Sequence, residues 1–201
     1  MLTIERVPEL SPLRHAIYRL RYEVFSDELH HQSKFVDHES RTIRDPLDEN
    51  CQLFAAVVDG EVVGTIRGNV AAESDLEESY TDMGIHGGDF EDASVTSKLA
   101  VALSHRGTTV AYRLASAALV YGLNNGVRFN IIRCEPHLVP FYERLGFKVK
   151  HRISHLYAEW GEGVVMVLDL HDEQHLRQVG SPFLKHYLAW SARQAEEAVA
   201  A

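Results

Sequence analysis

The chain has 201 residues, which suits one well-packed domain and is short for two. Hydrophobic residues make up 45% of the sequence and charged residues 24%, a composition typical of globular rather than disordered proteins. The formal net charge of -9 argues against general binding of nucleic acid, and no apolar run reaches the roughly 20 residues of a membrane-spanning helix. No signal-peptide pattern follows Met1, so we expect a cytoplasmic protein.

The first half of the chain carries strand, helix and loop patterns in turn. Asp59-Gly60, between two apolar runs, is a strong signal for the turn of a hairpin. A polar stretch without a clear period predicts a long loop, a kind of segment that often carries function. The expected elements are a strand at 2–7, a helix from Ser11-Pro12 with Ser11 as its N-cap, the polar loop at 30–50, and strands at 52–58 and 62–70.

The second half continues the interleaving of strands and helices, which predicts a single α/β (α+β) domain. We expect residues 1–170 to form this domain and residues 171–201 to form a helical extension packed on it. The expected elements are an acidic insertion at 71–93 with a short helix, strands at 95–103, 129–134, 147–156 and 164–170, a turn at 161–163, helices at 106–124 and 136–145, and a last helix from Ser181-Pro182 with Phe183, Leu184, Tyr187 and Leu188 on one face.

Charge is distributed unevenly along the chain. Residues 71–93 contain eight acidic residues and no Lys or Arg, whereas residues 128–152 contain six Lys or Arg and two acidic residues. A basic stretch on an acidic protein can steer an anionic ligand or a small acidic partner. The same stretch would equally suit an ordinary solvated surface.

A turn of small residues joins the expected strand Leu99-Ala100-Val101 to the next helix. Such a turn exposes several backbone N–H groups, which together with the helix dipole can bind a pyrophosphate or phosphodiester. Arg106 would add a positively charged guanidinium whose N–H donors suit a phosphate. Small residues are, however, also common at the start of ordinary helices. The candidate phosphate-binding residues are Arg106, Gly107, Thr108, Thr109, Val110 and Ala111.

Together with this turn, the segment Pro140-Phe141-Tyr142-Glu143-Arg144-Leu145-Gly146-Phe147 resembles the GNAT superfamily of N-acetyltransferases. There, a strand ending like Leu-Ala-Val precedes the motif Arg/Gln-x-x-Gly-x-Gly/Ala, which holds the pyrophosphate of coenzyme A, and a later helix ends Tyr-Glu-Arg-x-Gly-Phe. The resemblance implies a mixed, largely antiparallel central sheet flanked by helices, and a Tyr142 that protonates the departing thiolate. Thr109 stands where the motif usually has glycine, and Glu135 where an asparagine is usual.

Motifs in the N-terminal half resemble the branch that contains acyl-homoserine-lactone synthases and long-chain N-acyl amino acid synthases. These enzymes share Arg-Tyr-x-Val-Phe, Asp-x-x-Asp, Gly-x-x-Arg and Ser-Arg in this order, and their acyl donor is commonly an acyl carrier protein. The resemblance covers residues 17–170. It implies that the acceptor-binding residues are Arg21, Phe25, Asp45, Asp48, Arg67, Ser97 and Lys98.

Three departures from lactone synthases favour a different acceptor. Lys98 replaces the arginine that follows Ser97, Val95 stands where those enzymes carry a glutamate, and the loop after Leu29 has no tryptophan. An amino acid or related amine therefore fits better as the acceptor than the substrate of lactone synthesis. Arg21 and Arg67 could hold a carboxylate of that acceptor, form salt bridges to the two aspartates, or do both.

The reaction itself sets requirements that these residues can meet. An amine that attacks a thioester must lose a proton, and both the oxyanion and the thiolate need stabilisation. A backbone N–H between Leu99 and Val101 could serve the oxyanion, and Tyr142 could protonate the thiolate. We name Glu135 as the second candidate catalytic residue, while the general base stays open among Glu135, His137, Asp45, Asp48 and water.

The favoured function is an N-acyltransferase that moves an acyl group longer than acetyl from an acyl carrier protein or acyl-coenzyme A to an amino acid or similar amine. The thioester is then a co-substrate, and no permanently bound cofactor is expected. Lys148, Lys150 and Arg152 are the candidate docking residues for a carrier protein, and a homodimer is compatible with the sequence. The alternatives are a short-chain, acetyl-coenzyme A-dependent N-acetyltransferase and a catalytically silent thioester-binding domain. His171 and His175 match no zinc motif, so no metal site is expected.

Overall fold

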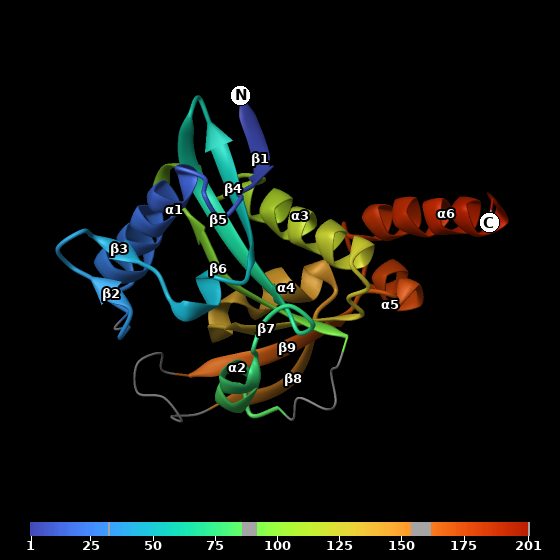
Figure 1. The fold of residues 1–201 in the computed structure, drawn as a ribbon. Coiled ribbons are helices and arrows are strands. Elements are labelled where there is room, and N and C mark those ends of the chain that lie inside the picture. Colours follow the sequence, from blue (N-terminus) through green and yellow to red (C-terminus); the bar gives the residue numbers. More distant parts are fainter. Residues whose placement is uncertain (32, 86–91, 154–161, 201) are drawn as a thin grey trace.

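The computed structural model describes residues 1–31, 33–85, 92–153 and 162–200. These residues form a seven-stranded sheet with helices on both faces and a separate two-stranded ribbon (Figure 1). The strand order in the sheet is β1-β4-β5-β6-β7-β9-β8, and every neighbouring pair is antiparallel except β6 and β7. The expected mixed, largely antiparallel GNAT-like sheet is therefore confirmed.

The strands lie close to the positions that the sequence predicts. In the main sheet they are β1 (Leu2–Arg6), β4 (Gln52–Val58), β5 (Glu61–Val70), β6 (Ala93–Val101), β7 (Phe129–Cys134), β8 (Lys148–Ile153) and β9 (Gly163–Asp169). The ribbon consists of β2 (Val36–Asp37) and β3 (Thr42–Ile43).

The helices flank the sheet, and Figure 1 shows the last of them, α6, extending away from it towards the C-terminus. The α-helices are α1 (Leu13–Arg21), α2 (Glu77–Asp82), α3 (Val110–Asn124), α4 (Val139–Leu145), α5 (Glu173–Gln178) and α6 (Leu184–Ala200). A π-helix, Tyr22–Glu28, continues α1, and 3-10 turns lie at Pro46–Asp48, Leu103–His105 and Pro136–Leu138. In the described part of the chain, no helix has the length and apolar character that crossing a membrane requires.

The two faces of the sheet are covered by different helices, because successive side chains of a strand point in opposite directions. On the α1 face, Leu53 and Ala55 of β4 pack against Ile17 of α1. On the α3 face, Phe54 and Ala56 pack against α3. Gly64 of β5 allows close packing there, since a Cβ at this position would lie 2.8 Å from Val110 Cγ1.

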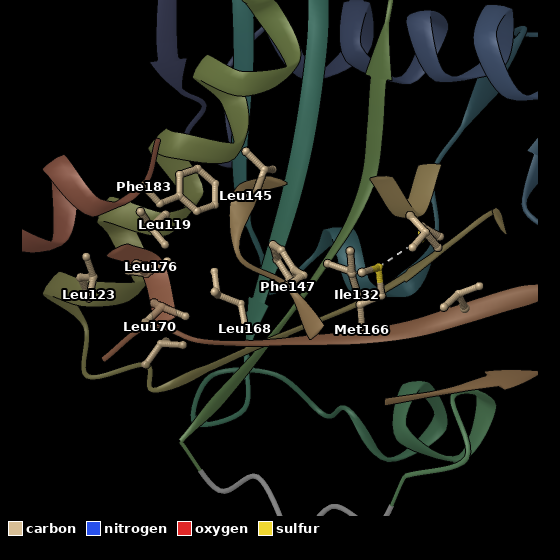
Figure 2. Close-up of a cluster of buried hydrophobic side chains, with 14 of the residues drawn as sticks. Leu119, Leu123, Ile132, Leu145, Phe147, Met166, Leu168, Leu170, Leu176 and Phe183 are labelled. Carbon is tan, nitrogen blue, oxygen red and sulfur yellow. Dashed lines mark hydrogen bonds between the residues drawn. The ribbon is translucent and has the colours of Figure 1, made fainter. Parts of the chain in front are cut away.

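A second part of the core joins β7 and β9 to α3, α4 and α5. Figure 2 shows this cluster, in which side chains from separate elements meet on one face of the sheet. Gly146 ends α4 with a φ of +110°, a conformation that glycine adopts without strain. The labelled cluster residues are Leu119, Leu123, Ile132, Leu145, Phe147, Met166, Leu168, Leu170, Leu176 and Phe183.

Several boundaries differ from the sequence predictions. Ser11 is not the N-cap, because Pro12 takes that position, although Ser11 Oγ still accepts a hydrogen bond from the N–H of Leu13. The helix expected from Arg106 begins at Val110, since Leu103–His105 forms a separate 3-10 turn. The segment at 30–50, expected to be one long loop, contains the β2–β3 ribbon and a 3-10 turn.

The C-terminal region also departs from the prediction. Helix α5 was not predicted, since six residues offer too short a pattern, and Asp172 caps it by accepting the N–H of His175. Leu188 does not share the packed face of α6; it is 37% exposed, whereas Phe183, Leu184 and Tyr187 lie against the core. The predicted end of strand 147–156 and the turn residue 161 lie outside the described residues.

Candidate active site

The central feature of the site is the place where β6 and β7 separate. The two strands pair only over three residues each, ending at Val95 and Ile131, although both strands continue further. Figure 1 shows β7, β9 and β8 turned away from the direction of β4, β5 and β6. Beyond Val95, the edge of β6 that faces β7 has no strand partner among the described residues. The backbone of β6 at Leu99, Ala100 and Val101 therefore borders the opening, where the carbonyl of Val101 accepts a hydrogen bond from Arg106.

A bulge shapes β6 within this opening. Arg67 of β5 pairs with Ser97 and Thr65 pairs with Ala100, so β6 contains one residue more than β5 between these pairs. Lys98 has a φ of 54°, in the left-handed region that non-glycine residues rarely adopt. The bulge redirects the backbone next to Leu99, Ala100 and Val101. This is where the sequence predicts an oxyanion-binding N–H.

The turn before α3 has several backbone N–H groups that donate to no described residue. Gly107 has a φ of +72°, and the hydroxyl of Thr108 bonds to the carbonyl of His105 and accepts the N–H of Val110. Because α3 has 15 residues, its dipole adds positive potential at this end. The backbone N–H groups that donate no hydrogen bond to any described residue here are those of Gly107, Thr108, Thr109, Ala111 and Tyr112.

The contacts of the Arg106 side chain lie outside this turn. Its guanidinium forms an ion pair with Glu28, at the end of the π-helix, and also donates to the carbonyl of Val101 at 3.0 Å. Arg106 thus ties the π-helix to the end of β6. The sequence could not reveal this contact, because the paired residues lie 78 positions apart.

Tyr142 of α4 lies on the α3 face, beside the end of β7. Its ring packs edge-on between Phe141 and Phe147, at centroid distances of 5.0 Å and 5.5 Å. Burial, with a smaller contribution from Cys134, raises the pKa of the Tyr142 hydroxyl well above its ordinary value. The hydroxyl forms no hydrogen bond with any described residue. Tyr142 is therefore a protonated phenol with an unused donor near neutral pH.

On the α1 face, four of the predicted acceptor-binding residues form a buried ionic cluster. Arg21 is fully buried, and its Nη1 lies 2.8 Å and 2.9 Å from the two carboxylate oxygens of Asp48. Arg67 pairs with Asp45 and lies 3.3 Å from Asp48 Oδ1. Burial alone would raise the pKa of Asp48, but Arg21 and Arg67 outweigh it and hold that pKa below its ordinary value.

The cluster retains unused donors. Nε and Nη2 of Arg21 are buried and have no hydrogen-bond partner in the described part of the chain. Buried guanidinium groups are normally saturated with acceptors. Arg67 Nε donates to Ser97 Oγ at 3.1 Å, which joins the cluster to β6.

Lys98 brings a third positive charge to the same place. Its Nζ lies 3.4 Å from Asp45 Oδ2 and 5.9 Å from the ring centre of Phe25. Burial lowers the pKa of Lys98 to about 8, opposed by Asp45 and reinforced by Arg67 and Arg21. The five charged residues of the cluster are Arg21, Arg67 and Lys98 against Asp45 and Asp48, which gives 3 − 2 = +1 when all are ionised.

Glu135, directly after β7, contacts two histidines. Its Oε1 lies 3.0 Å from His31 Nε2, and its Oε2 lies 3.2 Å from His137 Nδ1. His31 also stacks on Phe25, with ring centres 6.1 Å apart and planes at 9°. The sequence singled out Glu135 and His137, but it gave no signal that His31, from the loop after the π-helix, would join them.

The basic residues of β8 do not all lie on the same face of the sheet. The register places Lys148 opposite Val167 and Arg152 opposite Val164, with a bulge at Lys150 between them. Because Val164 and Val167 lie an odd number of residues apart on β9, Lys148 and Arg152 lie on opposite faces of the sheet. Lys148 is also paired with Asp172 at 3.0 Å.

Within the described ranges, no group of three or more His, Cys, Asp or Glu side chains could hold a metal ion. An apolar hollow lies over α3 and α6, and no residue of β6 or β7 lines it. Its lining residues are Phe54, Ser116, Ala117, Val120, Tyr121, Asn124 and His186.

Comparison with known families decides the classification. The sequence profile of the N-acyl amino acid synthase FeeM family matches residues 16–168, about three quarters of the chain. The chain belongs to this family. It is an acyltransferase, and its reaction is acyl transfer from a thioester to an amine. No curated protein matches the chain in sequence.

Solved structures share the fold of this FeeM-family chain at low sequence identity. The N-acyl amino acid synthase FeeM from uncultured soil microbes has a TM-score of 0.70 at 14% identity, covering 92% of this chain and 97% of FeeM. BjaI, a coenzyme A-dependent acyl-homoserine lactone synthase solved with MTA, has a TM-score of 0.67 at 17% identity, covering 90% of each chain. Escherichia coli ElaA has a TM-score of 0.59 at 19% identity, covering 84% of this chain and all of ElaA.

Proposed function

We propose that this chain transfers an acyl group longer than acetyl to the amine of an amino acid or a similar small molecule. The observation that carries the proposal is the opening between β6 and β7, which has a donor cradle at the end of β6 and a cationic cluster on its α1 face. The turn at the end of β6 can receive an anionic thioester carrier. The cationic cluster on the α1 face can receive an acceptor with a negative group.

The donor side would use the turn before α3. The five backbone N–H groups at Gly107, Thr108, Thr109, Ala111 and Tyr112 suit phosphate oxygens, which accept several hydrogen bonds at once. Both an acyl carrier protein and acyl-coenzyme A present phosphate at the end of a pantetheine arm. Thr109 adds a side chain where the superfamily motif has glycine, but its backbone N–H keeps its donor role.

The acceptor side would use Arg21, Phe25, Arg67, Ser97 and Lys98, with Asp45 and Asp48 holding the arginines in place. The excess positive charge of the cluster favours an acceptor that carries a carboxylate, and Arg21, which is fully buried, would act through this charge and not by direct contact. The two roles weighed from the sequence, internal salt bridge and substrate binding, are compatible in this arrangement.

Chemistry would take place between these two sides. As the amine attacks, negative charge develops on the thioester oxygen, and a backbone N–H beside the bulge at Leu99, Ala100 and Val101 would stabilise it. As the tetrahedral intermediate collapses, Tyr142 would donate its proton to the departing sulfur. The phenol is protonated near neutral pH and can donate a hydrogen bond to the developing thiolate, whereas burial, which raises the pKa of Tyr142, opposes complete transfer of the proton.

Several further assignments belong to this proposal. We place the enzyme in the cytoplasm, with an acyl carrier protein as the favoured donor and a homodimer as a compatible assembly. Lys148, Lys150 and Arg152 would dock the carrier from the two faces of β8. Residues 171–201 would act as an extension of the catalytic domain, since Leu176, Phe183 and Leu184 belong to its core.

A panel of thioesters tests the proposal. Purified enzyme is offered acetyl-coenzyme A, long-chain acyl-coenzyme A and long-chain acyl carrier protein, each with amino acids as acceptors and with matched amines lacking the carboxylate. We expect thiol release and amide formation with long-chain donors, at least tenfold faster with the amino acid than with the matched amine. Turnover of acetyl-coenzyme A with no long-chain turnover would establish the short-chain alternative instead.

A further inference from the structure

A thioester carrier that extends from the turn before α3 into the opening must pass the end of β6. Its phosphate would lie at the backbone N–H groups of Gly107 to Tyr112, and its thioester beside Leu99 to Val101. The pantetheine arm between these two places carries no charge. Charged side chains at the end of β6 therefore act mainly on the phosphate groups of the carrier.

The last backbone carbonyl of β6 faces this opening. The N–H of Ala102 donates to the carbonyl of Val63 on β5 at 2.9 Å, and successive residues of an antiparallel strand direct their backbone groups to alternate edges. The carbonyl of Val101 therefore points away from β5. Arg106 Nε donates to it at 3.0 Å, which places the guanidinium on the opening side of β6, next to the path of the carrier.

Glu28 holds the guanidinium in this position. Its Oε2 forms an ion pair with Nη2 of Arg106, while Nη1 of Arg106 bonds to no described residue. The side chain of Arg106 is 38% exposed and that of Glu28 is 30% exposed, so both charges can act on a ligand in the opening. A carboxylate thus lies beside the path of the carrier, where the sequence predicts only the cation.

We propose that Glu28 determines which thioester carrier the enzyme prefers, by disfavouring carriers with many phosphate charges. The inference rests on the proposed function and names the residue that separates its two classes of donor. Coenzyme A carries a diphosphate and a phosphomonoester, whereas the arm of a carrier protein ends in a singly charged phosphodiester. The carboxylate of Glu28 repels each phosphate charge and occupies the guanidinium that would otherwise attract it, so its effect grows with the charge of the carrier.

The acidic residues near Glu28 have other partners. Asp27, the preceding residue of the π-helix, forms an ion pair with Arg41, which lies between β2 and β3. Glu135, after the end of β7, contacts two histidines. Asp27 therefore offers a matched control for Glu28, because it is a partly exposed acid on the same helix whose partner is not Arg106.

Carriers of graded charge separate an effect of charge from a structural effect. We would measure kcat/KM for one long acyl group carried by coenzyme A, by phosphopantetheine and by pantetheine, the last of which has no phosphate. The proteins compared are wild type, Glu28→Gln and Asp27→Asn. Each substitution removes the charge of one acid from a partly exposed ion pair, so neither should unfold the protein.

We expect Glu28→Gln to raise kcat/KM about tenfold for the coenzyme A thioester, about threefold for the phosphopantetheine thioester and less than about twofold for the pantetheine thioester. Calorimetry should show that Glu28→Gln also binds free coenzyme A about tenfold more tightly at low salt, and added salt should reduce this difference from wild type because it screens the charges. Asp27→Asn should match wild type with all three carriers.

If Glu28→Gln changes kcat/KM by the same factor for all three carriers, or brings no gain with coenzyme A, Glu28 does not select the carrier, and the acyltransferase proposal still stands. A wild type that transfers an acyl group from none of these thioesters, nor from acyl carrier protein, would overturn the proposed function itself. The first failure is read from the ratio between carriers and the second from the absence of any turnover, so the two are distinguishable.

Discussion

The buried ionic cluster makes a quantitative prediction about stability. Replacing Asp48 with Asn keeps the shape of the side chain but removes its charge, so the cluster changes from a formal +1 to +2 in a fully buried place. Breaking a buried ion pair by removing one partner costs about 3–5 kcal/mol, because the remaining charge is left uncompensated. A protein of this size loses about 2–4 °C in Tm for each kcal/mol, so the expected drop is about 6–20 °C.

Urea and thermal denaturation of Asp48→Asn measure this cost, and two further variants sharpen the result. Glu78→Gln breaks the exposed pair of Lys34 and Glu78, 3.5 Å apart, and should change stability by less than about 1 kcal/mol. The double variant Arg21→Met with Asp48→Asn restores the wild-type formal charge, so it should recover part of the loss. If Asp48→Asn lowers the free energy of unfolding no more than Glu78→Gln does, the charge balance of the cluster does not stabilise the fold as predicted.

Three other substitutions test separate parts of the site. Tyr142→Phe should lower kcat about 100-fold with little change in KM, because the substitution removes the hydroxyl donor but keeps the ring. If the variant and the wild type have the same kcat, Tyr142 does not protonate the thiolate. The pKa of Lys98 is lower in the folded than in the unfolded state, so the unfolded chain binds more protons between about pH 8 and 10.5. The free energy of unfolding of the wild type, relative to that of Lys98→Met, should therefore rise with pH across this window in urea titrations. A difference that does not change with pH would contradict the lowered pKa. Gly64→Val should lower the free energy of unfolding by about 1–3 kcal/mol and weaken binding of coenzyme A, because the new valine side chain would meet Val110 and Leu114 of α3. Binding equal to that of the wild type in calorimetry would show that the turn before α3 does not depend on this contact.

Local signals in the sequence predicted much of the fold. The hairpin turn at Asp59-Gly60 is present with φ values of 51° and 89°, and the strand expected at 129–134 has the same bounds in the structure. Such features depend only on residues that are neighbours in the sequence, so they can be predicted from the sequence alone. Likewise, the turn of small residues expected before the next helix is present, with Gly107 at a φ of +72°.

Features that depend on tertiary contacts could not be predicted. The bulge of β6 places a lysine, Lys98, in the left-handed region, where a sequence reading expects glycine or asparagine. The ion pair of Arg106 with Glu28 and the contact of Glu135 with His31 join residues far apart in the chain. Only the pairing of strands and the path of the loop after the π-helix bring these partners together.

The most direct test of the account is a structure of the enzyme with a non-hydrolysable thioether analogue of long-chain acyl-coenzyme A. We predict that its sulfur lies within about 3.5 Å of the Tyr142 hydroxyl, and that its pyrophosphate accepts hydrogen bonds from the N–H groups of Gly107 to Tyr112. An analogue bound in the hollow over α3 and α6, or one whose sulfur lies far from Tyr142, would contradict the assignment of the opening between β6 and β7 as the site of acyl transfer.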